Sequence, residues 1–489
     1  MAPKNQSIHL KREVLVRMVK AFFSDDFKKN VRLIPYDMRP KGSDVSFRCC
    51  IYKERAILKD RIIADLGVSI EDDDEMTLLS EYAEQALNRE KPDEHVLTIL
   101  DAACKGCVGG KILVTELCQG CVARPCETAC KFGAISIING KSVIDERKCR
   151  RCKNCIAVCP YNAITHITVP CEDACSVGAI QKNEHGSARI DFDKCISCGK
   201  CVIQCPFGAV HEKSQLIDIM KNIKANKKIV ALVAPSIAGQ LSGTMYQLKD
   251  ALLKAGFTDV VEVAKGADIT TANEAKEFDE RISDGEQFMT TSCCAGYNEL
   301  VKKHIPEMKP FVSDTKTPLY YTAQLVKEQM PDAITVFVSP CVAKRSEVRN
   351  NPNVDYLINF EETDALLTGL DINLADCEKS ELDDNISRQG RNYGVSGGVA
   401  AAVKKASDDE DFVKPCYING INKESIKQLK KYAKDGVCPY GNLIEVMCCE
   451  GGCVGGNATI KSVKSAVQDI NDFSKDFKNI DEILQNKKQ

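Results

Sequence analysis

Cysteine is the residue type whose number and spacing point most directly to chemistry in this sequence. The chain has 27 cysteines among 489 residues, and sixteen of them lie between Cys104 and Cys205. Two more are adjacent at Cys49 and Cys50, and the other nine begin at Cys293. A small secreted domain uses so many thiols for disulfides, whereas a long chain without a secretion signal uses them to bind metal. We therefore expect an iron–sulfur redox protein.

Two segments carry cysteines in the order C-x2-C-x2-C-x3-C followed by proline, which is the signature of bacterial ferredoxins. Three closely spaced thiolates of such a run bind one [4Fe–4S] cube, and the fourth reaches another cube. A zinc site is disfavoured, because zinc knuckles rarely carry the fourth cysteine and its proline. The two runs are Cys149, Cys152, Cys155 and Cys159, and Cys195, Cys198, Cys201 and Cys205.

The other cysteines of this region complete further sets under the same crossing rule. Sixteen cysteines equal four cubes, so we expect about four accessory [4Fe–4S] clusters that act as an electron conduit; three clusters, with the last set idle, is the alternative. The expected sets are Cys118, Cys121 and Cys126 with Cys159; Cys149, Cys152 and Cys155 with Cys130; Cys195, Cys198 and Cys201 with Cys175; and the leftover Cys104, Cys107, Cys171 and Cys205.

Cysteines recur after residue 213 in three short segments: TTSCCAGYNEL, SPCVAKRSE and VMCCEGGCVGG. Each segment follows an apparent strand, and ligands of open α/β sheets bind just past the carboxyl ends of strands. Four thiolates from three distant loops are enough to enclose one more cube. Ordinary buried thiols are the alternative.

The elements that position these cysteines divide the chain into four parts. Residues 1–100 alternate charged and apolar residues at helical spacing and predict a helical segment. Residues 101–213 contain the internal repeat and form the ferredoxin-like cluster-binding part. Residues 214–460 alternate short β-branched runs with helical stretches, which predicts an α/β domain with a largely parallel sheet. Residues 461–489 predict a helical tail, so the fold class is α+β and α/β multidomain.

Charge and hydropathy exclude two kinds of partner. Lys and Arg number 66 against 69 Asp and Glu, a net charge of -3, and a nucleic-acid binder carries a basic excess instead. No stretch approaches eighteen consecutive apolar residues, so we expect no membrane span. The N-terminal sequence lacks the apolar core of a secretion signal, so we expect a cytoplasmic protein.

The three cysteine segments resemble, in combination, the signature motifs of the [FeFe]-hydrogenases, and the resemblance spans roughly residues 104–458. It implies that residues 214–460 form an iron-hydrogenase-like domain that holds an H-cluster. That cofactor is a [4Fe–4S] cube joined through a cysteine sulfur to a two-iron unit with CO, cyanide and a dithiolate bridge. The implied activity is the reversible conversion of two protons and two electrons into H2.

The resemblance also implies roles for individual residues. Cys294, Cys341, Cys449 and Cys453 match the ligands of the cube, with Cys453 as the bridging ligand. Cys293 matches the proton-donating cysteine, and Lys344 matches a lysine that bonds a cyanide, a charge-assisted bond in a dry pocket. The residues expected to face the two-iron unit are Pro235, Ser236, Ser396 and Gly397.

Three charged residues at helical spacing precede the first motif. Glu274, Glu277 and Arg281 share one face of a predicted helix, which on its own indicates a solvated charged stripe. By the resemblance they belong to a proton relay that also includes Ser313. The implied order places Arg281 and Glu274 at the surface, followed by Ser313, Glu277 and Cys293.

The sequence also departs from the family's usual motifs. Ala295 replaces a proline, and Cys448 and Glu450 flank Cys449 where alanine and proline are usual. By resemblance the partners are ferredoxin or a similar electron carrier and the hydrogenase maturation proteins, with no nucleic acid and no membrane. A non-catalytic H2 or redox sensor and a hydrogenase-related cluster carrier are the alternatives.

Overall fold

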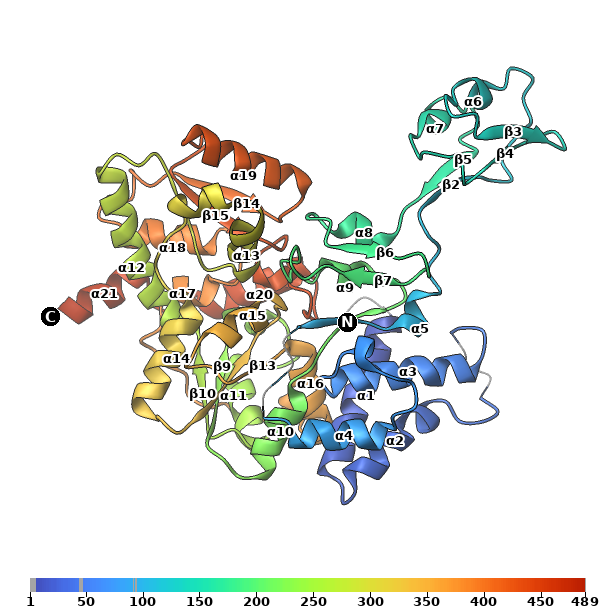
Figure 1. Cartoon of the computed structure of the whole chain (residues 1–489). Coiled ribbons are helices and arrows are strands. Elements are labelled where there is room, and N and C mark those ends of the chain that lie inside the picture. The colour runs from blue at the N-terminus through green and yellow to red at the C-terminus, as the bar shows by residue number, and fades with distance from the viewer. Residues whose placement is uncertain (1–5, 44–46, 91, 93–94, 489) are drawn as a thin grey trace.

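The computed structural model describes residues 6–43, 47–90, 92 and 95–488, and its described residues before 90 are mainly helical (Figure 1). Helix α1 is amphipathic and buries Leu15, Met18 and Phe22 along one stripe. The elements of this part are α1 (Gln6–Phe23), α2 (Phe27–Met38), α3 (Ile51–Asp65), η1 (Ile70–Asp72) and α4 (Leu79–Asn88).

The N-terminal helices do not form a core of their own. Helix α1 packs along α16 (Phe360–Gly369), and their apolar side chains belong to one continuous buried cluster. Three ion pairs cross this contact: Lys11–Glu361 at 2.6 Å, Arg12–Asp364 at 2.5 Å and Lys20–Asp371 at 3.0 Å. The predicted boundary at residue 100 therefore does not separate two hydrophobic cores.

The cluster-binding part consists of short antiparallel strand pairs joined by single helical turns. Strand β1 pairs with β8, so the chain leaves the body and returns to it at the same place. Its elements are β1 (Leu97–Ile99), α5 (Asp101–Cys104), β2 (Lys111–Val114), α6 (Pro125–Thr128), β3 (Ile135–Ile138), β4 (Lys141–Ile144), α7 (Asn154–Ala157), β5 (Ile164–Ile167), α8 (Pro170–Ala174), β6 (Ile180–Lys182), β7 (Ala188–Ile190), α9 (Lys200–Gln204) and β8 (Val210–Glu212).

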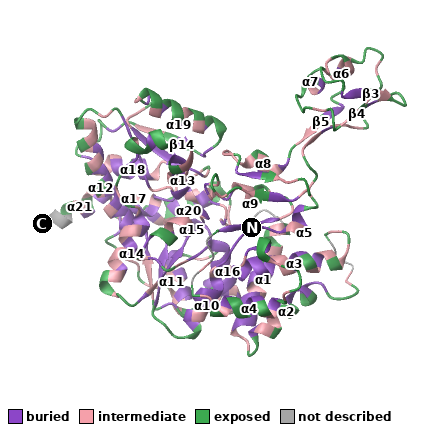
Figure 2. Cartoon of the chain, viewed as in Figure 1, coloured by how far each residue is buried: buried purple, intermediate pink, exposed green. Residues whose placement is uncertain are grey.

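Residues 111–167, the distal lobe, project away from the rest of the molecule (Figure 1). Strands β2 and β5 pair at the base of the lobe, and β3 pairs with β4. Most of its residues are exposed or half-buried, whereas the body contains most of the buried residues (Figure 2). The second copy of the internal repeat, residues 170–210 with α8 and α9, is called the second repeat and lies against the body instead (Figure 1).

Two parallel sheets form the frame of the C-terminal part, with strand orders β10-β9-β12-β13 and β11-β15-β14. Every residue of β9 and β15 is buried, as is typical of parallel strands covered on both faces. The strands are β9 (Ile229–Val233), β10 (Asp259–Glu262), β11 (Met289–Thr290), β12 (Ile334–Val338), β13 (Tyr356–Ile358), β14 (Pro415–Asn419) and β15 (Leu443–Met447).

Helices connect and cover these strands, as the alternating pattern predicts. They are α10 (Leu216–Lys224), η2 (Pro235–Gly239), α11 (Met245–Lys254), α12 (Ala264–Ser283), α13 (Ala295–His304), η3 (Pro306–Phe311), α14 (Pro318–Gln329), α15 (Ala343–Asn350), α16, η4 (Leu374–Asp376), α17 (Arg388–Asn392), α18 (Gly398–Ala406), α19 (Lys423–Asp435) and η5 (Cys453–Gly455).

The C-terminal segment forms α20 (Val463–Ser474) and α21 (Ile480–Lys488). Helix α20 buries Ala466 and Ile470 completely and lies against η2. The approach is close, because a Cβ on Gly239 would lie 2.4 Å from the Ala466 carbonyl oxygen. Among the described residues, no helix has the length and apolar character needed to span a membrane.

Candidate metal centres

Three loops, each at the carboxyl end of a parallel strand, bring four cysteine side chains together. Cys294 follows β11, Cys341 follows β12, and Cys449 and Cys453 follow β15. The four sulfurs lie close enough together that a negative charge on any one of them would repel a charge on each of the other three. Burial raises the pKa of Cys341 and of Cys453 to about 12. Nearby positive charge, such as bound iron, would favour their thiolate form.

This donor set fits a cluster better than an ion. In the part of the chain that the structure describes, no group of three or more His, Cys, Asp or Glu side chains is arranged to hold a single metal ion. A [4Fe–4S] cube is larger than an ion, so its thiolates surround a cavity instead of converging on a point. Four cysteines and no histidine are also the usual ligands of such a cube.

A buried hydroxyl lies beside the cysteine set. Ser236, in the first turn of η2, is fully buried, and its Oγ has no hydrogen-bond partner among the described residues. A Cβ on Gly394 would lie 2.9 Å from the Cβ of Ser236, and one on Gly452 would lie 2.6 Å from the Ser396 nitrogen. The two loops and η2 therefore meet next to Cys453. An unsatisfied buried hydroxyl in a glycine-lined wall fits a polar cofactor ligand.

The other two residues expected to face the two-iron unit lie in the same wall. Pro235 begins η2, directly before Ser236. Gly397 adopts φ +91°, a conformation that favours glycine, and its backbone nitrogen donates to Glu445 Oε1 at 2.6 Å.

Lys344 is a buried cation next to the cysteine set. Burial lowers the pKa of its ammonium, but the Glu347 carboxylate outweighs this and the pKa is raised overall. Its Nζ pairs with Glu347, which also accepts a hydrogen bond from Thr317. Sequence reasoning did not assign Glu347 a role, although it lies one helical turn after Lys344 in the same motif.

The predicted relay residues do lie together, but in a different order. Glu277 pairs with Arg281 at 2.9 Å and accepts a hydrogen bond of 2.7 Å from Ser313 Oγ. Thr315, which the sequence did not single out, donates a second 2.7 Å bond to the same carboxylate oxygen. The side chains of Glu277 and Arg281 keep 17% and 16% of their surface exposed.

The expectation that Glu274 lies at the surface is wrong. Glu274 is fully buried, accepts a hydrogen bond from the Ser292 nitrogen at 3.3 Å, and lies close to the Ser313 side chain. Burial raises its pKa to about 8. Glutamates at i and i+3 share a helix face, but only the packing around α12 decides which of them faces inward. The order from the surface is Arg281, Glu277, Ser313, Glu274 and Cys293.

Cys293 completes this chain of groups at its inner end. The thiol packs against Tyr393, Val399 and Met447, and its pKa is raised well above the ordinary value by burial and by the Glu274 charge. Cys293 is therefore a neutral thiol between Glu274 and the four-cysteine set.

The sixteen cysteines of the repeats gather into four separate groups. Two groups line two cavities in the distal lobe, and the other two lie next to each other in the second repeat. The groups are Cys118, Cys121, Cys126 and Cys159; Cys130, Cys149, Cys152 and Cys155; Cys175, Cys195, Cys198 and Cys201; and Cys104, Cys107, Cys171 and Cys205.

Backbone amides point at several of these sulfurs in a repeated pattern. The nitrogen four residues on donates to Cys130, Cys159, Cys175 and Cys205, at 3.1 to 3.3 Å. Hydrogen bonds to the sulfurs favour the thiolate form and adjust the potential of a bound cube. The grouping and the amide bonds both fit four cubes.

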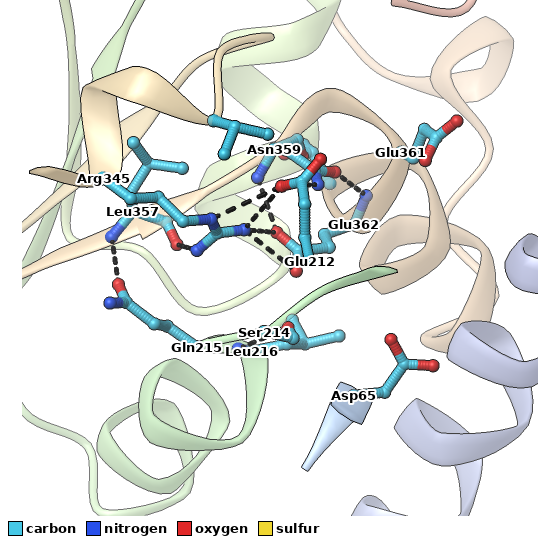
Figure 3. Close-up of polar contacts among 12 residues, drawn as sticks. Asp65, Glu212, Ser214, Gln215, Leu216, Arg345, Leu357, Asn359, Glu361 and Glu362 are labelled. Atoms are coloured by element: carbon cyan, nitrogen blue, oxygen red, sulfur yellow. Dashed lines mark hydrogen bonds and ion pairs between the residues drawn. The ribbon is translucent and has the colours of Figure 1, made fainter. Parts of the chain in front are cut away.

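A buried polar network joins the second repeat to the motif helix α15 (Figure 3). Arg345 lies between Glu212, at the end of β8, and Glu362, with contacts of 3.4 and 3.0 Å. Asn457, just past the Cys453 loop, bonds to Glu212 and accepts from the Val342 nitrogen at 3.1 Å. This network therefore fixes three cysteine-bearing segments together, and no sequence motif marked it.

An open cleft of about 760 Å³ reaches the middle of the line of groups from Arg281 to Cys293, at Ser313. Ser313, Thr315 and Glu347 contribute to its wall. Water in this cleft has access to the hydroxyls that contact Glu277 and to the partner of Lys344.

The protein is thus an iron–sulfur redox protein. Its cysteine groups lie on ferredoxin-like repeats and on a parallel α/β frame. The family model for the C-terminal domain of the iron-only hydrogenase large subunit matches residues 227–457, and a 4Fe-4S binding domain matches residues 142–165 and 188–211. The periplasmic [Fe] hydrogenase large subunit of Nitratidesulfovibrio vulgaris is 30% identical over 66% of this chain and 88% of its own length. The chain belongs to the iron-only hydrogenase family.

Other relatives show the breadth of this family. Iron hydrogenase 1 of Clostridium pasteurianum is 27% identical over 50% of this chain, which spans only 52% of that relative's length. A probable cytosolic Fe-S cluster assembly factor of Drosophila persimilis is 25% identical over 42% of this chain and 54% of its own length. A solved [FeFe]-hydrogenase from Chlamydomonas reinhardtii matches 54% of this chain and 91% of its own, at 21% identity and a TM-score of 0.45.

Proposed function

We propose that this protein is a hydrogenase that interconverts two protons and two electrons with H2 at an H-cluster. The observation that carries the proposal is the continuous line of groups from Arg281 to Cys293, which ends beside the four-cysteine set. A cluster that only stores or carries electrons needs no buried acid next to it. A site that consumes or releases protons needs such an acid to deliver or accept them.

The ligands proposed for the cube of this cofactor are Cys294, Cys341, Cys449 and Cys453, with Cys453 also bonded to the two-iron unit. When bound, that unit supplies the metal site at which protons and electrons combine. Lys344, beside Cys341 and Cys453, is suited to bond an anionic ligand such as cyanide. Ser236 offers its unpartnered hydroxyl from the η2 side, and the glycine-lined loop of Ser396 and Gly397 lets a ligand approach the backbone closely.

The chain's own residues then move and hold the proton. Glu274, with a pKa of about 8, exchanges a proton near neutral pH in either direction. Ser313 lies close to both glutamates, so its hydroxyl passes the proton between them. Cys293 remains a neutral thiol and is the last protein group before the cofactor.

The accessory cubes supply the electrons, and the distal lobe is the proposed docking surface for the carrier. The lobe contains nine Lys and Arg against four Asp and Glu, a net charge of +5, although the whole chain carries -3. Cys152 of the outer cysteine groups is exposed there. An acidic electron carrier such as a ferredoxin complements this surface. Maturation proteins that insert the two-iron unit are the second proposed partners.

A cluster carrier is the second candidate function, because the assembly-factor relatives match part of this chain. An infrared spectrum of the anaerobically matured protein, in the region where iron-bound CO and cyanide absorb, separates the two. Bands there, together with H2 formation from a reduced carrier, support the hydrogenase. Fully loaded cubes without such bands favour the carrier, and bands without turnover favour the sensor.

A further inference from the structure

Cys49 and Cys50 are neighbouring thiols that belong to none of the proposed cluster-binding groups. Their sulfur atoms lie 3.8 Å apart. Cys49 is exposed and Cys50 is half-buried, whereas Cys377 and Cys438, which also have no proposed role, are buried. A solvent-accessible thiol with a second thiol beside it is the arrangement typical of cysteines that are oxidised reversibly.

Cys50 lies at the start of a long helix, which makes it the more reactive of the two thiols. It directly precedes Ile51, the first residue of α3, and its own backbone is extended. The backbone amide of Lys53, followed by the Cys49 thiol, lowers the pKa of the Cys50 thiol, and the Lys53 ammonium acts in the same direction. A helix N-terminus and a nearby cation both favour a thiolate, which is the nucleophilic form of cysteine.

Arg48 anchors the chain directly before the thiol pair. Its Nη1 donates to Glu54 Oε1 at 3.1 Å, and its Nη2 donates to the Phe207 carbonyl oxygen at 3.2 Å. Glu54 lies in the first turn of α3 and is 1% exposed. The pair is therefore held where α3 meets the second repeat, with Cys49 at the surface.

We propose that Cys49 and Cys50 form a thiol–disulfide exchange site that reacts with small disulfides and closes to a reversible disulfide between the two neighbours. The Cys50 thiolate attacks one sulfur of the incoming disulfide and releases the other half as a thiol. The Cys49 thiolate then attacks the Cys50 sulfur and releases the second half. The two cysteines thus lose two protons and two electrons, and the incoming disulfide gains them as two thiols.

The disulfide between these neighbours opens readily. Adjacent Cα atoms lie about 3.8 Å apart, below the range of about 4.4–6.8 Å that is usual for a disulfide. The closed form is therefore strained and easily reduced by other thiols, so the site works in both directions. Neither step involves the two-iron unit, so an absence of H2 turnover would not affect this inference.

The test treats the full chain, with its cubes in place, with oxidised glutathione in the absence of oxygen. The remaining thiols are then blocked with N-ethylmaleimide in acidic denaturant, and tryptic peptides are weighed by mass spectrometry. Cleavage after Arg48 and Lys53 yields CCIYK, which contains these two cysteines and no others. We expect this peptide to lose two hydrogens and to carry neither maleimide nor glutathione, and dithiothreitol should reverse the change.

Two variants separate the roles of the two thiols. Cys49→Ser should retain one glutathione on Cys50, because no second thiol displaces it. Cys50→Ser should take up glutathione on Cys49 about tenfold more slowly than Cys49→Ser does on Cys50, because Cys49 lacks the helix N-terminus. Cys377, buried and alone on its tryptic peptide, is the internal control and should stay fully labelled by maleimide.

Three results would overturn the proposal. The first is a CCIYK peptide that stays labelled by maleimide or keeps glutathione without closing to the internal disulfide. The second is equal oxidation of Cys377, because the reaction would then not depend on the pair. The third is a loss of iron from Cys49→Ser before any oxidation, because Cys49 would then be a cluster ligand.

Discussion

Glu274 and Glu277 lie three residues apart on α12, yet their surroundings give them different chemistry. Glu277 meets solvent, Arg281 and two hydroxyls, so its carboxylate has several polar partners. Glu274 has one amide donor and an oxygen, Oε2, without a hydrogen-bond partner among the described side chains. The inner glutamate is therefore the one suited to hold a proton near neutral pH.

The buried Glu274 makes the free energy of unfolding decrease as pH rises. Its folded-state pKa of about 8 lies above the ordinary 4.5, so between these values the unfolded chain releases a proton that the folded chain keeps. Ionisation thus favours unfolding, and this group's contribution lowers the free energy of unfolding as pH rises from about 4.5 to about 8.

Glu274→Gln removes that dependence while keeping an oxygen for the Ser292 amide. We expect its melting temperature, relative to that of the unchanged protein, to rise steadily across this pH range. Thermal unfolding at several pH values measures the difference, with Glu277→Gln as the matched control. A constant difference between Glu274→Gln and the unchanged protein would contradict the assignment.

Cys293→Ser tests the inner end of the relay. Serine holds its proton more tightly than cysteine and is a poor acid, so H2 turnover should fall at least about 100-fold, the lower range for loss of an acid–base group. Iron content and the infrared bands should not change, because Cys293 is not a proposed ligand. Turnover equal to that of the unchanged protein would remove Cys293 from the route.

At the scale of elements, α15 connects the proposed active site to the electron conduit. One of its faces carries Lys344 and Glu347 toward the cysteine set, and another carries Arg345 into the network with Glu212 and Glu362. All three network side chains are at most 3% exposed. A buried ion network of this kind adds little net stability, but removal of one partner leaves uncompensated charges.

Arg345→Met should destabilise the protein by about 3–5 kcal/mol, because Glu212 and Glu362 lose their buried cation. Lys327→Met is the control: its pair with Asp355, at 3.0 Å, is partly exposed and should contribute about 0–1 kcal/mol. Parallel thermal unfolding measures both variants. Equal melting temperatures for the two would show that the network does not stabilise α15.

At the scale of the whole molecule, charge is distributed unevenly between two bodies. The distal lobe is basic and projects outward, whereas the remainder of the chain carries the acidic excess (Figure 1). Eight of the nine basic residues of the lobe are exposed. Such a separation would direct the proposed acidic carrier to the lobe, where two cysteine groups lie.

Replacement of Arg147, Lys148 and Arg150 by Glu should lower the rate of electron transfer from an acidic carrier by about tenfold or more at low salt. The difference should shrink as salt rises, because screening weakens the attraction. Stopped-flow kinetics measures it, with Lys427→Glu on α19 as a control outside the lobe. Unchanged rates would place the docking surface elsewhere, and salt-dependent binding of nucleic acid by the lobe would favour a different partner.

The sequence alone predicted those features that are determined by residues close together in the chain. Three cysteines separated by two residues each lie on one short loop, so the grouping of Cys195, Cys198 and Cys201 was foreseeable. The alternation of apolar runs with helices likewise predicted the parallel sheets, because a strand buried on both faces must be apolar throughout. The chain's family also followed from motifs of this local kind.

Only the tertiary structure decided which residues meet across long distances. The sequence could not show that Glu274 is the inner glutamate, since both glutamates satisfy the same helical spacing. Nor could it show that α1 shares a core with α16, or that Glu212, Arg345 and Asn457 meet, because no local pattern connects them. The second repeat meets α13 for the same reason: the Lys303 ammonium donates to the Cys195 carbonyl oxygen at 2.7 Å, and residues 108 positions apart share no local pattern.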